Sequence, residues 1–131
     1  NWPNSGEIDV LEHVGFDEGH IVSSVHNIAH HGDLSNSDQT KHIVVDDVIS
    51  TFKNYILEWD EKQIKTFVDD KLIFSYSKNN QPWERWPFDE KFHFILNIAI
   101  GGNWGGIKGI DDNAFPTKME IEHFRVYKKK P

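Results

Sequence analysis

Residues 6–12 read Gly-Glu-Ile-Asp-Val-Leu-Glu, which places three carboxylates within six residues, separated by apolar side chains. In an extended strand the side chains alternate between two faces, so Glu7 and Asp9 share one face and Glu12 would point away from them. A β-bulge adds one residue to a strand and returns the next side chains to the first face. A bulge at Val10-Leu11 would therefore align all three acids, and the stretch predicts a bulged strand.

Three acids on one face of a strand would influence each other's ionisation. Like charges held close together raise the pKa of at least one carboxyl group, which leaves one acid protonated while another is ionised. Cleavage of a glycosidic bond requires that combination. The alternative interpretation is structural, because acidic residues often occupy the solvent-facing side of an antiparallel strand whose apolar residues face inward.

The composition indicates one acidic, aromatic-rich domain spanning residues 1–131. The net charge of −7 makes nucleic acid and anionic membranes poor partners, whereas a neutral polysaccharide is compatible with it. Five Trp and nine Phe are many for a small domain. Exposed aromatic rings can serve as stacking platforms for sugars, although we expect most Phe in the core. There are no cysteines, which excludes disulfides and Cys-based metal sites. No apolar run approaches the roughly 18 residues of a membrane helix, and no signal peptide is visible.

The remaining chain predicts short strands separated by turns, which indicates an all-β sandwich. The expected strands are residues 20–29, 41–46, 52–59, 63–68, 72–76, 92–100 and 117–127, with a hairpin turn at 69–71. Residues 92–100 carry apolar side chains on both faces and are expected to form a central strand, in which the polar Asn97 needs hydrogen-bond partners. We expect Trp59, Phe67 and Phe74 to be buried.

A group of histidines and a glycine-rich turn could each carry chemistry. His26, His30 and His31 suggest a metal site, because four-residue spacing suits zinc ligands on a helix. The surrounding residues 30–40 are turn-rich and supply no acidic third ligand at matching spacing, so we predict no metal there. The glycine-rich turn at residues 101–106 lacks the Gly-Lys-Ser/Thr ending of a phosphate loop, and its glycines present Trp104 on a flexible turn.

Three blocks in the same order along the chain carry a family resemblance. They are residues 1–12 (NWPNSGEIDVLE), residues 86–89 (WPFD) with 92–106 (FHFILNIAIGGNWGG), and residues 115–127 (FPTKMEIEHFRVY). Together they resemble glycoside hydrolase family 16, and most closely its laminarinase-type members, the endo-β-1,3-glucanases with a bulged Glu-x-Asp-x-x-Glu strand. The resemblance implies a β-sandwich of the concanavalin A-like jelly-roll type, a secreted protein, and endo-acting hydrolysis of β-1,3-glucan with retention.

The resemblance also implies catalytic roles for the three acids. Glu7 would be the nucleophile that forms a glycosyl-enzyme intermediate. Glu12 would be the acid that protonates the leaving oxygen and then the base that activates water. Asp9 would hydrogen-bond Glu7 and tune its charge.

Four further positions are interpreted through the same resemblance. Trp2 is expected to stack on a sugar ring, with His26 and Trp104 as further substrate-binding candidates. Family members often carry Asp at the position of Glu122, where it helps to hold a structural calcium ion. This chain has Glu there, and the other expected ligands lie in a part of the family domain that this sequence lacks. We therefore expect no metal and no cofactor, with Glu122 as the candidate ligand for the alternative of a structural calcium ion.

The resemblance covers nearly all of this chain but only about the C-terminal half of a family domain. Half a sandwich would expose strand edges and an apolar face, so we expect association with a complementary N-terminal chain or self-association. The alternatives to an enzyme are a non-catalytic glucan-binding β-sandwich module and an inactive fragment of the enzyme. Mixed-linkage β-1,3-1,4-glucan as substrate, and transglycosylation as reaction, stay open beside hydrolysis of β-1,3-glucan.

Overall fold

Six short strands and one turn of helix make up the regular structure of the described part of the chain. The computed structural model describes residues 1–33, 35, 38–128 and 130. Its elements are β1 (Glu7–Glu12), β2 (His20–His26), β3 (Thr40–Val44), β4 (Tyr55–Trp59), β5 (Gln63–Val68), β6 (Lys71–Ser77) and a 3₁₀ helix η1 (Asp112–Ala114). None of the described helical residues forms a segment long and apolar enough to cross a membrane.

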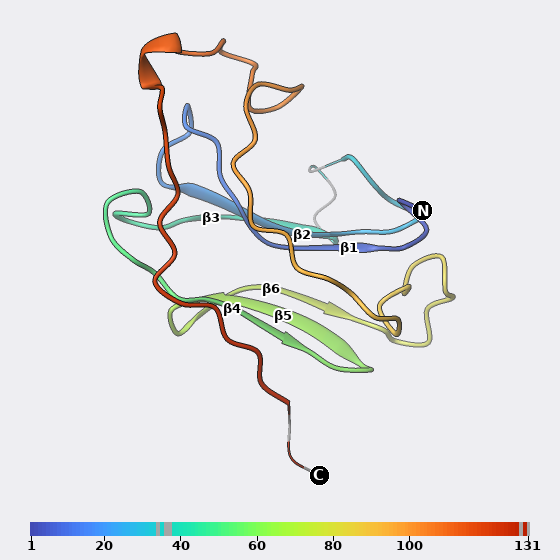
Figure 1. Ribbon diagram of the computed structural model, residues 1–131. Coiled ribbons are helices and arrows are strands. Elements are labelled where there is room, and N and C mark those ends of the chain that lie inside the picture. The colour runs from blue at the N-terminus through green and yellow to red at the C-terminus, as the bar shows by residue number, and fades with distance from the viewer. Residues whose placement is uncertain (34, 36–37, 129, 131) are drawn as a thin grey trace. The chain divides into compact units, whose positions relative to one another are not determined.

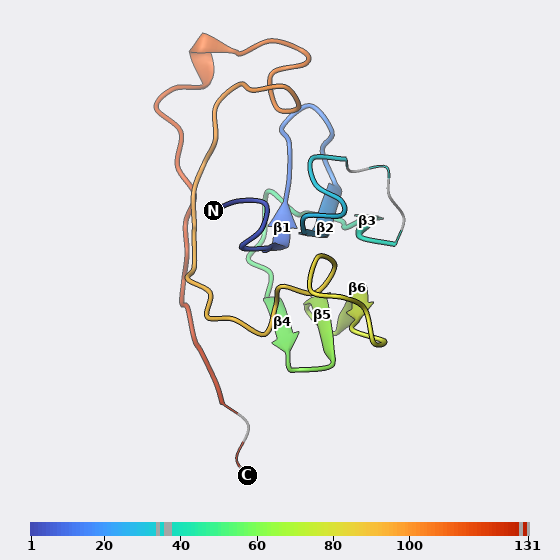
Figure 2. The ribbon, with the colours of Figure 1, turned by 90° about the vertical axis from the view of Figure 1, so that its right-hand side faces the viewer.

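The chain divides into two units, Asn1–His93 and Phe94–Pro131. The first unit contains two three-stranded antiparallel sheets, ordered β1-β2-β3 and β4-β5-β6. Figure 1 shows the strands of both sheets, and Figure 2 looks along them, so that the sheets appear as two layers. This arrangement confirms the predicted all-β sandwich, and β5 and β6 form the predicted hairpin, in which Val68 pairs with Lys71.

The core of the first unit lies between the two sheets. It joins side chains from β2, β5 and β6 to two rings from the loop that follows β6: Ile21, Val25, Ile64, Val68, Ile73, Phe74, Tyr76, Trp86 and Phe88. In β2 and β5 the two core residues of each strand are four positions apart, so they lie on the same face of the sheet. Trp86 and Phe88 are 2% and 1% exposed although they lie in a loop, so this loop is a structural part of the sandwich.

Gly6 fixes the entry of the chain into β1. It adopts φ of 72°, a conformation that L side chains rarely accept. A Cβ atom placed there would also lie 2.7 Å from Cγ of Pro87 and 3.0 Å from Cε1 of Phe88. Only glycine therefore allows the turn before Glu7 to pack directly onto the buried loop.

The second unit differs from the prediction. Residues 92–100 and 117–127 were expected to be strands, and neither segment has a ladder partner among the described residues. A central strand needs hydrogen-bonded neighbours on both edges, and without them an apolar pattern on both faces does not produce a strand. Phe94 and Phe124 contact each other with ring centroids 4.7 Å apart, but both rings stay exposed, as does Asn97. The expected place of Asn97 inside a central strand is therefore wrong.

Large apolar side chains of the second unit are exposed on both faces of the extended segments. Ile95 is 70% exposed and Leu96, its neighbour, 58%. A surface of this kind is typical of an interface, and the expected association with a second chain stays a prediction.

Two expectations about aromatic residues in the first unit are also wrong, and one is confirmed. Trp59 ends β4 and is 37% exposed, because its indole turns towards the Phe88 carbonyl, to which Nε1 donates at 3.0 Å. Phe67 is half-buried, because it lies on the opposite face of β5 from the core residues Thr66 and Val68. Phe74 is 2% exposed and lies in the core as expected.

Candidate active site

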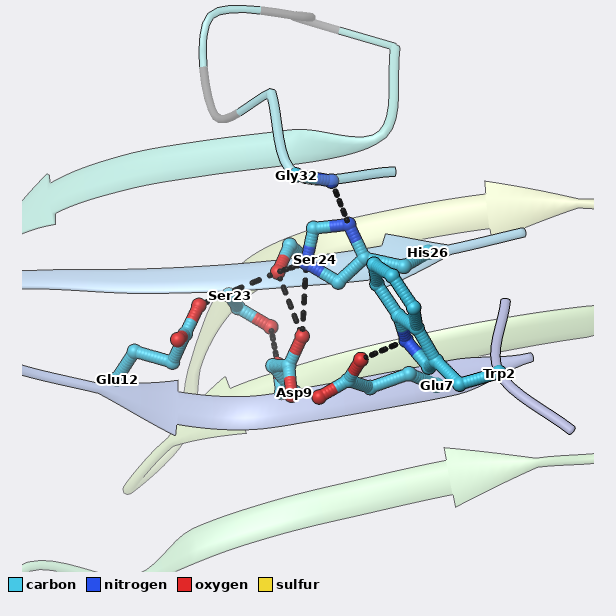
Figure 3. Close-up of polar contacts among 8 residues, drawn as sticks. All are labelled: Trp2, Glu7, Asp9, Glu12, Ser23, Ser24, His26 and Gly32. Carbon is cyan, nitrogen blue, oxygen red and sulfur yellow. Dashed lines mark hydrogen bonds and ion pairs between the residues drawn. The ribbon is translucent and has the colours of Figure 1, made fainter. Parts of the chain in front are cut away.

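The three acids of β1 lie on one face because the strand contains the predicted bulge. β1 pairs with β2 in the register Asp9↔Ser24 and then Glu12↔Val22, so three residues of β1 span two residues of β2. The extra residue returns Glu12 to the face of Asp9. The Ser24 hydroxyl shows this directly, because it contacts Asp9 Oδ2 at 3.0 Å and Glu12 Oε2 at 3.4 Å. Figure 3 shows Glu7, Asp9 and Glu12 on the same side of the strand.

Trp2 lies beside the first of these acids. Its indole Nε1 donates to Glu7 Oε2 at 2.5 Å, and the ring remains 54% exposed. The ring also meets His31 edge-on, with centroids 5.1 Å apart. Trp2 therefore orients the Glu7 carboxylate while leaving much of its ring surface open.

His26 faces the middle acid and is 8% exposed. Its Nε2 lies 3.2 Å from Asp9 Oδ2, and the backbone N–H of Gly32 donates to Nδ1 at 3.3 Å. Because Nδ1 accepts that bond, the ring proton is on Nε2 and points to Asp9. Both ring nitrogens of His26 therefore have protein partners, Asp9 at Nε2 and Gly32 at Nδ1. Contact of His26 with a substrate stays a prediction.

The surroundings of Glu7, Glu12 and His26 shift the pKa values of these groups. Burial raises the pKa of Glu12 to about 7, and repulsion by Asp9 adds to the effect. Burial and the same repulsion also raise the pKa of Glu7, but the Trp2 hydrogen bond and His26 oppose the shift. The hydrogen bond to Asp9 raises the pKa of His26 against the effect of its burial. With a pKa of about 7, Glu12 therefore holds a proton in a large fraction of the molecules near neutral pH.

Glu7, Asp9 and His26 could also present ligand atoms to a cation, since one atom of each lies within 4.8 Å of the others. The same side chains have protein partners: Trp2 donates to Glu7, and Ser24 and His26 contact Asp9.

The sequence also singled out His31, Trp104 and Glu122. His31 uses Nδ1 to contact the Asn27 carbonyl at 3.2 Å. Trp104 and Glu122 belong to the second unit, where Trp104 is half-buried and Glu122 is exposed beside His123 Nδ1 at 3.5 Å. Residues 34, 36 and 37 of the turn-rich stretch 30–40 lie outside the described residues.

The sequence interpretation missed Ser24, which connects Asp9, Glu12 and His26. The signal was present: residues 24 and 26 are two apart on a strand and so share a face. What the pattern lacked was the register that places β2 beside β1.

Comparison with known proteins identifies the family. The chain matches Glycosyl hydrolases family 16 over residues 1–123. It is 39% identical to a β-glucanase from Rhodothermus marinus, over 97% of this chain and 46% of that protein. The laminarinase structure from Rhodothermus marinus superposes with a TM-score of 0.81 at 40% identity, covering 88% of this chain and 47% of the other.

A laminarinase structure from Flavobacterium sp. UMI-01 gives a TM-score of 0.79 at 38% identity, covering 87% of this chain and 48% of the other. The chain thus spans about half the length of the relatives that it matches. The family match runs through the bulged acidic strand and both sheets of the first unit. This chain belongs to glycosyl hydrolase family 16.

Proposed function

We propose that the acidic face of β1 cleaves internal β-1,3-glucosidic bonds with retention of anomeric configuration. The observation that carries the proposal is the bulge, because it places Glu12, with a pKa of about 7, beside the other two acids on one face. One protonated and one ionised carboxyl group are the two components that retaining hydrolysis needs. The similarity to laminarinases supports β-1,3-glucan as the substrate class.

The environments of the two glutamates support the roles of Glu7 as nucleophile and Glu12 as acid/base. The Glu7 carboxylate accepts the Trp2 hydrogen bond, which stabilises its charge, and a charged carboxylate is the better nucleophile. Glu12 has its pKa raised to about 7 by burial and by Asp9, which suits a group that must give up and regain a proton near neutral pH.

In the first step, the Glu7 carboxylate oxygen forms a bond to the anomeric carbon while the bond from that carbon to the leaving oxygen breaks. Glu12 transfers its proton to the leaving oxygen. In the second step, ionised Glu12 takes a proton from water, and the water oxygen attacks the anomeric carbon and releases Glu7. Two displacements at one carbon restore the starting configuration.

Asp9 links the two glutamates electrostatically. Its carboxylate is held by Ser24 and His26, and its charge raises the pKa of both Glu7 and Glu12. In the proposed mechanism this repulsion favours the protonated form of Glu12 before the first step. It also favours the uncharged ester of Glu7 after that step.

The stereochemistry of the first product tests the proposed mechanism. We expect the chain to release reducing ends from soluble β-1,3-glucan and to form the β-anomer first. Proton NMR spectra recorded within the first minutes, before mutarotation, distinguish the two anomers. An α-anomer as first product would contradict retention and would require a water molecule attacking in a single displacement.

Changing Trp2 to Phe should move the acidic limb of the pH profile. Phe keeps a ring for stacking but removes the N–H that stabilises ionised Glu7, so the pKa of Glu7 rises. Because Glu7 must be ionised to attack, kcat/KM should begin to fall at a higher pH than in the wild type. The measurement is kcat/KM across the pH range, with KM for the glucan little changed.

Two further variants control this experiment. Trp2→Ala also removes the ring and should raise KM as well. Trp83→Phe changes an exposed tryptophan of the loop after β6 and should leave the profile unchanged. An acidic limb in Trp2→Phe that coincides with that of the wild type would show that the indole does not tune Glu7.

A further inference from the structure

Two buried hydroxyl groups meet between the sheets, directly behind the acidic face. Ser23 of β2 and Thr66 of β5 are both 0% exposed, and Ser23 Oγ lies 2.7 Å from Thr66 Oγ1. The neighbours on the inward faces of these strands are apolar: Ile21, Val25, Ile64 and Val68. Valine has nearly the shape of threonine, so packing alone does not require a hydroxyl here, and buried hydroxyls are retained where they are hydrogen-bonded.

The direction of the hydrogen bonds follows from the third partner. Ser23 Oγ also contacts the Asp9 backbone carbonyl oxygen at 2.7 Å. A carbonyl oxygen only accepts, so the single hydroxyl hydrogen of Ser23 goes to Asp9. The contact with Thr66 must then be donated by Thr66. The result is a relay in which Thr66 donates to Ser23 and Ser23 donates to the Asp9 carbonyl, linking β5 of one sheet to β1 of the other.

The relay ends where β1 departs from regular pairing. The register between β1 and β2 shifts between Asp9 and Glu12, and a bulge interrupts the backbone ladder at this point. Without the extra residue Glu12 would point to the opposite face of the strand. A donor fixed to the Asp9 carbonyl therefore acts on the peptide unit that begins the bulge.

We propose that Thr66 and Ser23 are positioning residues, which hold the Asp9 carbonyl and thereby keep the bulge that turns Glu12 towards Asp9 and Glu7. The proposal rests on the catalytic roles assigned above. It goes beyond them because neither residue lies on the acidic face. It means that Thr66, a residue of the opposite sheet, helps to orient the acid/base Glu12.

Thr40 provides a matched control. It is a strand threonine, 3% exposed, and its Oγ1 is buried without a hydrogen-bond partner among the described residues. It lies on β3 opposite Ser24. Thr40→Val therefore removes a buried hydroxyl of the same kind without breaking the relay.

The experiment compares Ser23→Ala, Thr66→Val, Thr66→Ser and Thr40→Val in the full chain, with circular dichroism as a check of folding. Ser23→Ala should lower kcat on β-1,3-glucan by on the order of ten- to a hundredfold, the scale expected when a catalytic group is displaced by about 1 Å. KM should change little, because both hydroxyls are buried behind the site. Thr66→Val should lower kcat less, since Ser23 can still donate to Asp9. Thr66→Ser and Thr40→Val should behave as the wild type.

Because Thr66 acts on Asp9 only through Ser23, the relay predicts a specific result for the double variant. Ser23→Ala already breaks both hydrogen bonds, so adding Thr66→Val should cause no additional loss of kcat. Two hydroxyls that stabilise the core independently would instead give losses that multiply. Multiplying losses would overturn the relay.

A readout without turnover separates this proposal from the proposed function. Titration of the Glu12 carboxyl by ¹³C NMR should show its pKa falling from about 7 towards the ordinary 4.5 in Ser23→Ala, because Glu12 leaves its buried place beside Asp9. A Glu12 titration and a kcat unchanged from the wild type in folded Ser23→Ala and Thr66→Val would overturn the relay. If Ser23→Ala does not fold, the nearly isosteric Thr66→Val decides the question. A wild-type chain that cleaves no glucan would refute the proposed function, and the titration would still decide the relay.

Discussion

Glu7→Gln is expected to abolish glucan hydrolysis, lowering kcat by more than roughly 10⁴-fold, the scale on which removal of a nucleophile acts. Glutamine has nearly the same shape as glutamate but carries no charge to attack the anomeric carbon, so no glycosyl-enzyme intermediate forms. The side chain can still meet the Trp2 indole, which limits any structural disturbance. The measurement is reducing-sugar release from soluble β-1,3-glucan.

Glu58→Gln provides the matched control, because Glu58 is an exposed acid on β4 and its loss should leave turnover unchanged. Affinity electrophoresis in a gel containing the glucan measures binding separately, and Glu7→Gln should still be retarded. If the wild type is retarded but releases no reducing ends, the chain is a glucan-binding module and its acids do not catalyse. Full activity in Glu7→Gln would contradict the assignment of the nucleophile.

Glu12→Gln should lower kcat on β-1,3-glucan by roughly 10²- to 10⁴-fold, the usual contribution of general acid–base catalysis. It should also remove the alkaline limb of the pH profile. The sign follows from the role: Glu12 must be protonated for the first step, so wild-type kcat/KM falls as pH rises through its pKa of about 7. A variant without an ionisable group at this position has no such limb.

A substrate with a good leaving group distinguishes loss of the acid from loss of the site. Aryl β-glucosides whose phenol departs without protonation need no acid in the first step, so Glu12→Gln should form the glycosyl-enzyme intermediate from them at a rate close to that of the wild type. A burst of phenol followed by slow turnover would be the signature. An equal loss on aryl glucosides and on glucan would show that Glu12 does more than transfer protons.

Local sequence was sufficient for the features that depend on strand periodicity. The spacing of Glu7, Asp9 and Glu12 requires an extra residue if the acids are to meet, and the bulge between Asp9 and Glu12 confirms it. The β5–β6 hairpin followed from two alternating runs around a polar turn. Neighbours along a strand carry this information, so no distant contact was needed to predict it.

Contacts between distant residues decided the rest. The Ser23–Thr66 hydrogen bond joins residues 43 positions apart, and no local pattern distinguishes these hydroxyls from that of Thr40. Trp86 and Phe88 are buried in a loop because the space between the sheets accepts their rings.

The segment 92–100 is a second case in which local sequence was not sufficient. Its apolar pattern suits a central strand, but a strand also requires partners for its backbone groups, and none of the described residues supplies them. The sequence alone determined which residues would share a face of β1. The tertiary structure decided which groups meet that face and which segments become strands, because hydrogen-bond partners and enclosed space exist only once distant parts of the chain are brought together.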